Sequence, residues 1–160
     1  DCDGLFIHPV IGEKKVGDFT GDIILKTYRE LVVQKYPNDK VIIGGFNNYS
    51  RYAGPKEAVF TALCRKNFGC SHFIVGRDHT GVGSFYSKDS AKRLFEELGD
   101  IGIQPIFFDE VYYCFKCNNY VEKCIHGLDP KSQISGSEVR RKLKKGKPIP
   151  DWLIRKLIMI

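Results

Sequence analysis

The chain has 160 residues, of which 42% are hydrophobic and 28% charged. This composition is typical of a globular domain and excludes a disordered, collagen-like or coiled-coil protein. The formal net charge is +6, but it is unevenly distributed, because residues 131–160 carry nine Lys or Arg against two acidic residues. Such a basic segment can bind nucleic acid, a membrane surface or a small polyanion, or it can be a solvated helix face. Hydrophobic runs such as Val41–Ile43 are far shorter than a membrane span.

Hydrophobic residues between positions 5 and 108 alternate between the periods of strands and of helices. Short strands are predicted at 5–7, 41–43, 72–75 and 103–108. Helices are predicted in the three intervals, the first ending before Pro37, the second running from Pro55 to Gly69 and the third ending at Gly99. The predicted inner face of the second helix consists of Ala58, Val59, Ala62 and Leu63. Strands that alternate with helices in this way predict an α/β fold, with a parallel sheet covered by helices on both faces.

Four segments follow the predicted strands directly, at 8–12, 47–54, 76–81 and 109–111. Ligands of parallel sheets bind beyond the carboxyl ends of the strands, so we expect these segments to form one rim. His8 is either a rim residue or a histidine packed in the core. Arg51 either reaches the rim or belongs to a turn that leads into the second helix.

The segment Gly76-Arg77-Asp78-His79, followed by Gly81 and Gly83, is the most specific candidate site. Glycines let backbone amides approach an anion closely, and the planar guanidinium of Arg77 can bind phosphate or sulfate oxygens. The alternative is a glycine-rich turn with a surface ion pair between Arg77 and Asp78. Exposed lysines on a helix bind anions weakly, so we expect the anion here and not on the basic segment.

The basic segment opens with Ser135-Gly136-Ser137-Glu138, which is a capping-box pattern at the start of a helix. Its amides and hydroxyls, with Arg140 one turn later, can attract phosphate. A plain capping box explains the spacing equally well. Asp151 is predicted to begin a last short helix.

Three cysteines and one histidine gather within thirteen residues as Cys114, Cys117, Cys124 and His126. Three thiolates and one imidazole complete a tetrahedral zinc site and leave no position for water or substrate, so the predicted zinc is structural. The alternative is a loop of reduced cysteines without metal. We expect a reducing, cytoplasmic setting, in which clustered thiols indicate a metal site more than disulfides.

The motifs at 8–12, 51–55, 65–79 and 134–140 closely resemble, in the same order, those of the ATP sulfurylase (sulfate adenylyltransferase) family. The resemblance covers nearly the whole chain, and the cysteine cluster is similar to a zinc loop of some family members. It implies a Rossmann-like nucleotidylyltransferase core at 1–112, a zinc-binding loop at 113–127 and a small, basic helical segment at 128–160.

The resemblance also implies a reaction, in which ATP and sulfate give adenosine 5′-phosphosulfate and pyrophosphate, with magnesium. Sulfate attacks the α-phosphorus in line, so the protein needs to position two polyanions and needs no nucleophilic side chain. Arg77 and His79 are the implied catalytic residues, and the amide of Thr80 is implied to bind sulfate. The implied ATP-binding residues are Gly76, Arg77, Asp78, His79, Val111, Ser135, Gly136, Ser137 and Arg140. A homo-oligomeric enzyme without nucleic-acid or membrane partners is expected.

One departure from the family concerns its Gln-x-Arg-Asn-Pro-x-His-x-x-His segment, which is absent from these 160 residues. That segment supplies sulfate-binding residues and two histidines that stabilise the transition state. We therefore expect the chain to be the C-terminal part of a longer enzyme and to be inactive alone. One alternative is a non-catalytic nucleotide- or anion-binding module with the same fold. Another is a zinc-ribbon-like nucleic-acid binder, which is disfavoured because only Trp152 lies among the C-terminal Lys and Arg residues.

Overall fold

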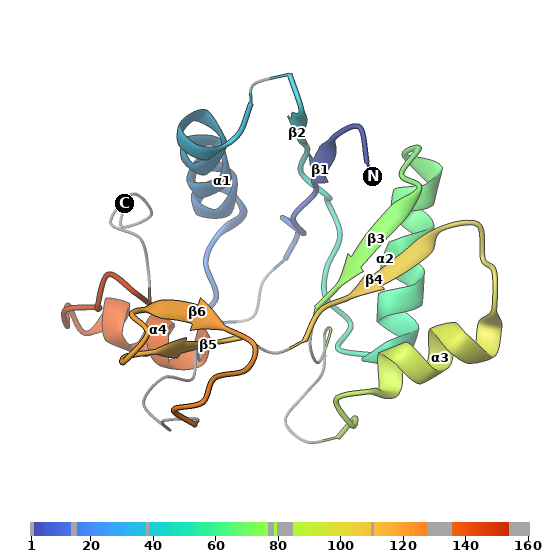
Figure 1. Cartoon of the computed structure of the whole chain (residues 1–160). Coiled ribbons are helices and arrows are strands. Elements are labelled where there is room, and N and C mark those ends of the chain that lie inside the picture. Colours follow the sequence, from blue (N-terminus) through green and yellow to red (C-terminus); the bar gives the residue numbers. More distant parts are fainter. Residues whose placement is uncertain are drawn as a thin grey trace. The chain divides into compact units, whose positions relative to one another are not determined.

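The computed structural model describes residues 2–13, 16–37, 39–76, 79, 85–109, 111–127 and 136–153, with the backbone alone for 136–138. The chain forms two compact units (Figure 1). Unit 1 comprises Asp1–Tyr49 and Val111–Ile160, and unit 2 comprises Ser50–Glu110. The boundaries predicted after residues 112 and 127, which separate the core, the zinc-binding loop and the basic segment, rest on sequence motifs and stay a prediction.

Unit 1 begins with β1 (Leu5–Ile7), α1 (Gly21–Lys35) and β2 (Val41–Ile43). The two strands pair in parallel, and a bridge between Val10 and Phe46 lies beyond them. The helix begins after Thr20, whose side chain accepts a hydrogen bond from the amide of Ile23, and it ends just before Pro37. A helix that connects two parallel strands is the arrangement that the alternating pattern predicts.

Unit 2 contains α2 (Pro55–Asn67), β3 (His72–Val75), α3 (Ser90–Leu98) and β4 (Gln104–Phe107). Strands β3 and β4 pair in parallel, with Val75 opposite Phe107 at their carboxyl ends. Helix α2 contacts both α3 and β3 (Figure 1). The core of this unit consists of Ala58, Ala62, Val75, Ala91, Phe95 and Ile103.

The structure confirms the predicted positions of the first three strands and shortens the fourth, predicted at 103–108, to Gln104–Phe107. Parallel pairing is confirmed within each pair of strands, and one continuous sheet stays a prediction. The predicted inner face of α2 is wrong in one respect, since Leu63 is 38% exposed. The polar side chains Glu57, Thr61 and Arg65 are buried instead. Their spacing of four residues places them in one row beside Ala58 and Ala62.

The segment predicted as a zinc loop contains a β-hairpin. Strands β5 (Tyr112–Cys114) and β6 (Asn119–Val121) pair antiparallel, with Cys114 opposite Asn119. Asn118 adopts a positive φ of 52° in the turn, a conformation that Asn tolerates better than most residues. The hairpin therefore fixes the direction of the cysteine-bearing backbone.

Within the basic segment, the described residues Gly136–Lys144 form α4. Ser135 lies outside the described residues, so the capping box stays a prediction. Residues 151–153 form a turn closed by a 2.9 Å hydrogen bond from the Leu153 amide to the Pro150 carbonyl, and the rest of the predicted last helix lies outside the described residues. Among the helices that the structure describes, none is long and apolar enough to cross a membrane.

Candidate functional site

A pocket of about 290 Å³ lies in unit 2 where β3 and β4 end and α3 begins. Gly76 follows β3 directly, Phe108 and Asp109 follow β4, and Lys88 and Lys92 flank the start of α3. The lining residues are Val75, Gly76, Lys88, Asp89, Ala91, Lys92, Phe107, Phe108 and Asp109. Two amines near strand ends and a helix N-terminus suit an anionic ligand, and the two carboxylates suit a hard cation that accompanies it.

This pocket brings together predicted and unpredicted residues. Gly76 was a predicted ATP-binding residue, whereas Lys88 and Lys92 were not singled out. The sequence feature that could have indicated these two lysines is their position at the start of the helix that follows the glycine-rich segment. Arg77, Asp78 and Thr80 lie outside the described residues, so their predicted roles stay predictions.

A buried polar row on α2 supports the loop before that helix. Glu57 is 4% exposed, and its carboxylate accepts hydrogen bonds from the amides of Arg51 at 2.9 Å and Ala53 at 3.0 Å. Between these residues Tyr52 has a φ of 55°, a conformation that costs on the order of 1–3 kcal/mol for a residue other than glycine. The two hydrogen bonds hold the backbone at this strained position.

Arg51, a possible rim residue by sequence, has an exposed side chain. Its guanidinium carbon lies 5.0 Å from the centre of the Phe60 ring, a cation–π geometry. Glu57 therefore fixes the backbone of Arg51 while Phe60 supports its side chain.

His79 packs against this polar row. Its Nε2 lies 3.3 Å from the Thr61 hydroxyl, and its ring meets Phe73 edge to face at 5.7 Å. Burial lowers the pKa of His79 below 6.5; Glu57 opposes this shift and Arg65 adds to it. The neutral imidazole is therefore favoured at neutral pH, which suits hydrogen bonding more than charge neutralisation.

The four predicted metal ligands come together in unit 1. The His126 Nδ1 lies 3.6, 3.4 and 3.1 Å from the sulfurs of Cys114, Cys117 and Cys124. The Cys124 sulfur lies 3.3 Å from that of Cys117 and 3.6 Å from that of Cys114. Zinc bonded tetrahedrally at about 2.3 Å to sulfur and 2.0 Å to nitrogen needs donor separations of about 3.5–3.8 Å. The donor set is one that zinc prefers. The five separations of 3.1–3.6 Å lie within or slightly below that range, so small side-chain shifts suffice for these residues to hold such a metal ion.

Hydrogen bonds within the cluster shift the pKa values of two of its thiols in opposite directions. The amide of Cys117 donates to the Cys114 sulfur at 3.4 Å. This backbone hydrogen bond is the main reason that the pKa of Cys114 falls to about 6. The neighbouring thiols of Cys124 and Cys114 raise the pKa of Cys117 to about 12. Without a metal, one thiolate is thus stabilised at the expense of another.

Aromatic side chains attach the metal-binding hairpin to the C-terminal turn. The Tyr113 ring stacks on Trp152 with centroids 5.1 Å apart, and Phe115 meets Trp152 edge to face at 5.3 Å. The Tyr120 hydroxyl donates a hydrogen bond to the Trp152 carbonyl. The hairpin therefore has both a metal site and an apolar contact to hold it in place.

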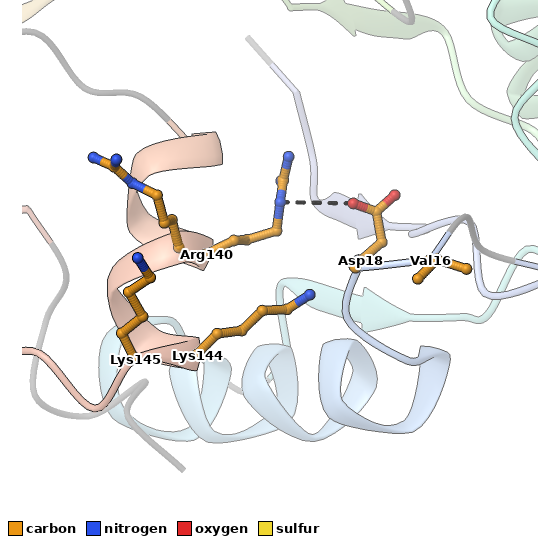
Figure 2. A pocket seen from close by; sticks show the side chains of 7 residues that line it. Val16, Asp18, Arg140, Lys144 and Lys145 are labelled. Carbon is orange, nitrogen blue, oxygen red and sulfur yellow. Dashed lines mark ion pairs between the residues drawn. The ribbon is translucent and has the colours of Figure 1, made fainter.

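The remaining predicted site residues lie in unit 1. The ring of His8 is half-buried and stacks on Phe6 at 4.4 Å, as a packed histidine does. Val111 is 46% exposed just before β5. Gly136 and Ser137 open α4, and Arg140 forms an ion pair with Asp18 at 3.6 Å (Figure 2).

Comparison with known proteins gives consistent matches. A sulfate adenylyltransferase of Staphylothermus marinus is 46% identical to this chain over 155 residues, covering 96% of the chain and 41% of the relative. One from Cenarchaeum symbiosum is 41% identical over the same shares of the two chains. The chain thus spans about two fifths of the length of these curated relatives.

A solved structure shares the fold at low sequence identity. The hexameric APS kinase from Thiobacillus denitrificans matches with a TM-score of 0.61 and 17% identity, over 97% of this chain and 29% of that one. The family model described as ATP-sulfurylase matches residues 1–159. The chain belongs to the ATP-sulfurylase family.

Proposed function

We propose that this chain is the nucleotide-binding part of a sulfate adenylyltransferase, which converts ATP and sulfate to adenosine 5′-phosphosulfate and pyrophosphate. The observation that carries the proposal is the identity of 41–46% to relatives of that name over 96% of the chain. The pocket beside Gly76, which is lined by two lysines, supports it as a place for a phosphate chain.

In the proposed reaction a sulfate oxygen forms a bond to the α-phosphorus while the bond to the bridging oxygen breaks and pyrophosphate leaves. Arg77 binds phosphate oxygens, and the backbone amide of Thr80 orients sulfate. Gly76, Asp78 and His79 contact ATP, with His79 acting through its neutral imidazole. Magnesium bound with ATP supplies neutralising charge on the phosphates. The protein thus contributes binding and alignment.

Other residues complete the nucleotide site in this proposal. Val111 lines the adenine position. The start of α4, with Ser135, Gly136, Ser137 and Arg140, binds the triphosphate. Arg51 stands at the rim and depends on Glu57 for its placement. His8, which stacks on Phe6, reaches the rim at most from its packed position.

The metal cluster has a structural role in this proposal. Zinc bound by Cys114, Cys117, Cys124 and His126 locks the hairpin and leaves no coordination position for substrate. None of the six cysteines, all in the described part of the chain, forms a disulfide. A reducing, cytoplasmic setting is consistent with this state.

The larger architecture belongs to the proposal as well. We infer one Rossmann-like parallel sheet with helices on both faces, and a core at 1–112 followed by the metal loop at 113–127 and the basic segment at 128–160. A homo-oligomeric enzyme is proposed, without nucleic-acid or membrane partners.

ATP binding by the chain itself tests the nucleotide site. Calorimetric titration with ATP and magnesium is expected to show binding that Arg77→Ala weakens about tenfold or more, because hydrogen bonds to charged groups contribute about 1.5–3 kcal/mol. Arg29→Ala, which removes an exposed arginine of α1, is the matched control and should change affinity less than twofold. Absence of ATP binding, or equal effects of the two variants, would contradict the proposed site.

An assay of product formation tests whether the proposed reaction depends on the two histidines of the segment that is absent from these 160 residues. The isolated chain should form no adenosine 5′-phosphosulfate above background, because it lacks the Gln-x-Arg-Asn-Pro-x-His-x-x-His segment. Sulfate-dependent pyrophosphate release at about 1 per second, a rate ordinary for enzymes, would show that the chemistry does not need that segment.

A further inference from the structure

Thr61 lies in the middle of the buried polar row on α2, with Glu57 one turn before it and Arg65 one turn after it. Its side chain is 5% exposed, and the sequence gave no reason to single it out. The Thr61 hydroxyl lies 3.3 Å from Nε2 of His79, which belongs to the glycine-rich segment that follows β3. Helix α2 therefore makes a side-chain contact with the segment to which ATP binding is proposed.

The direction of this hydrogen bond follows from the other partners of Thr61. The hydroxyl has one hydrogen, and two carbonyls of its own helix lie nearer than the histidine, that of Glu57 at 2.8 Å and that of Ala58 at 3.0 Å. A threonine that bonds back to the preceding turn of its helix directs its hydrogen at those carbonyls. Its oxygen then accepts a hydrogen bond from His79, so Nε2 is the nitrogen that carries the hydrogen.

The His79 ring is mostly neutral at neutral pH, so the position of its hydrogen decides what it can bind. Burial lowers the pKa of His79 below 6.5, while the charge of Glu57 raises it and that of Arg65 lowers it further. A neutral imidazole has one donor and one acceptor nitrogen. With the hydrogen on Nε2, the acceptor is Nδ1. Phe73, which the ring meets edge to face, limits the orientation of the imidazole.

We propose that Thr61 is a positioning residue that fixes His79 as the Nε2–H tautomer, with Nδ1 as a hydrogen-bond acceptor for the nucleoside part of ATP. The inference rests on the proposed function for the contact between His79 and ATP, and it names the chemistry of that contact. Phosphate oxygens are acceptors themselves and do not suit an acceptor nitrogen. The ribose hydroxyls and the adenine amino group are donors and do suit it.

Nitrogen-15 NMR of the histidine rings tests the tautomer, because each ring nitrogen reports whether it carries a hydrogen. The chain has four histidines, and His79→Gln identifies the signals of this one. At neutral pH the hydrogen should be on Nε2. Thr61→Val replaces the hydroxyl with a methyl group and should give a mixture of tautomers. It should also lower the pKa of His79 further, since an acceptor that favours the protonated ring is lost.

Thr61→Ser keeps the hydroxyl and should preserve both the tautomer and the pKa of His79. Thr27→Val is the matched control, because Thr27 of α1 makes the same bond to a carbonyl one turn earlier, that of Ile23 at 2.8 Å. It should leave the His79 signals unchanged. A hydrogen on Nδ1, or a pKa of His79 that rises in Thr61→Val, would show that Thr61 donates to Nε2 and would overturn the proposal. Equal changes in Thr27→Val would overturn it as well.

Calorimetric titration with ATP and magnesium tests the consequence for the ligand. Thr61→Val should weaken ATP binding about threefold or more, the effect of one misplaced hydrogen bond, whereas Thr61→Ser and Thr27→Val should change it less than twofold. The loss should disappear with the nucleotide that lacks the donor. Inosine triphosphate lacks the amino group, and 2′,3′-dideoxy-ATP lacks the ribose hydroxyls. A loss that persists with both analogues would place the contact on the phosphate chain and overturn the acceptor role.

Failure of this inference can be told apart from failure of the proposed function. If ATP binding responds to Arg77→Ala and not to Thr61→Val, the nucleotide site stands and the role of Thr61 is refuted. If the chain binds no ATP, the proposed function fails and the acceptor role toward ATP falls with it. The NMR experiment still decides whether Thr61 fixes the tautomer of His79.

Discussion

The metal-binding hairpin and the polar row on α2 hold their chain segments by different means. The hairpin and the residues that follow it gather four donor atoms within 4.8 Å of one another from a short stretch of sequence. The polar row instead buries Glu57 beneath a loop and satisfies it with two backbone amides. The first arrangement depends on an ion from solution, and the second depends on burial within the fold. Each should therefore fail under a different perturbation.

The largest effect is expected at the hairpin. Purified protein should contain about one zinc per chain, and Cys117→Ser should lose it, because three remaining donors bind zinc far more weakly than four. Trp152 is the single tryptophan and stacks on Tyr113, so its fluorescence should change when the hairpin opens. Amide exchange in β3 and β4 should stay protected.

Cys2→Ser is the control for this experiment, because Cys2 is exposed and lies outside the cluster. It should retain the metal and the native fluorescence. Full zinc content in Cys117→Ser, or a Cys114–Cys117 disulfide in reduced protein, would contradict the metal site. Loss of protection in β3 and β4 would show that the metal supports more than the hairpin.

The second effect is expected at Glu57. Glu57→Ala leaves two partly buried amides without their acceptor, at about 1–3 kcal/mol each, so the free energy of unfolding should fall by about 2–6 kcal/mol. Urea denaturation measures this change. Glu57→Gln should lie between the wild type and Glu57→Ala, since the amide oxygen still accepts a hydrogen bond.

Glu96→Ala is the matched control, since Glu96 is exposed on α3. Its effect should remain within about 0.5 kcal/mol, as for ordinary surface positions. Equal stabilities of Glu57→Ala and Glu96→Ala would show that the loop does not depend on the buried carboxylate. Zinc content should be unchanged in both variants, which separates this region from the hairpin.

The smallest effect concerns the pH dependence of stability. Because burial lowers the pKa of His79 in the folded state below 6.5, the unfolded chain takes up the proton first as the pH falls. Stability should therefore decrease as the pH drops through 6.5 toward the folded pKa, and it should be insensitive to this group above that range. His79→Gln should remove this part of the slope. An unchanged slope between pH 7 and pH 5, measured by urea denaturation, would contradict a shifted His79.

Local sequence signals determined much of this protein. The alternating hydrophobic periods located β1, β2 and β3 at their observed bounds. A short apolar run bounded by turn residues is typical of a buried strand. The spacing of Cys114, Cys117, Cys124 and His126 was sufficient to predict a metal cluster, because all four lie within reach of one another along the chain. Helix ends at Pro37 and Gly99 follow from backbone geometry that a single residue imposes.

Tertiary structure decided what depends on contacts between distant residues. The hydrophobic pattern did not single out Glu57, which is buried because the loop before α2 packs over it. Lys88 and Lys92 acquire a shared pocket through the pairing of β3 with β4. The charges of α4 become the wall of a pocket because Gly17 and Asp18, more than one hundred residues earlier, lie opposite them. Periodicity reports which face of an element is apolar, whereas burial of a charge depends on the partner that covers it.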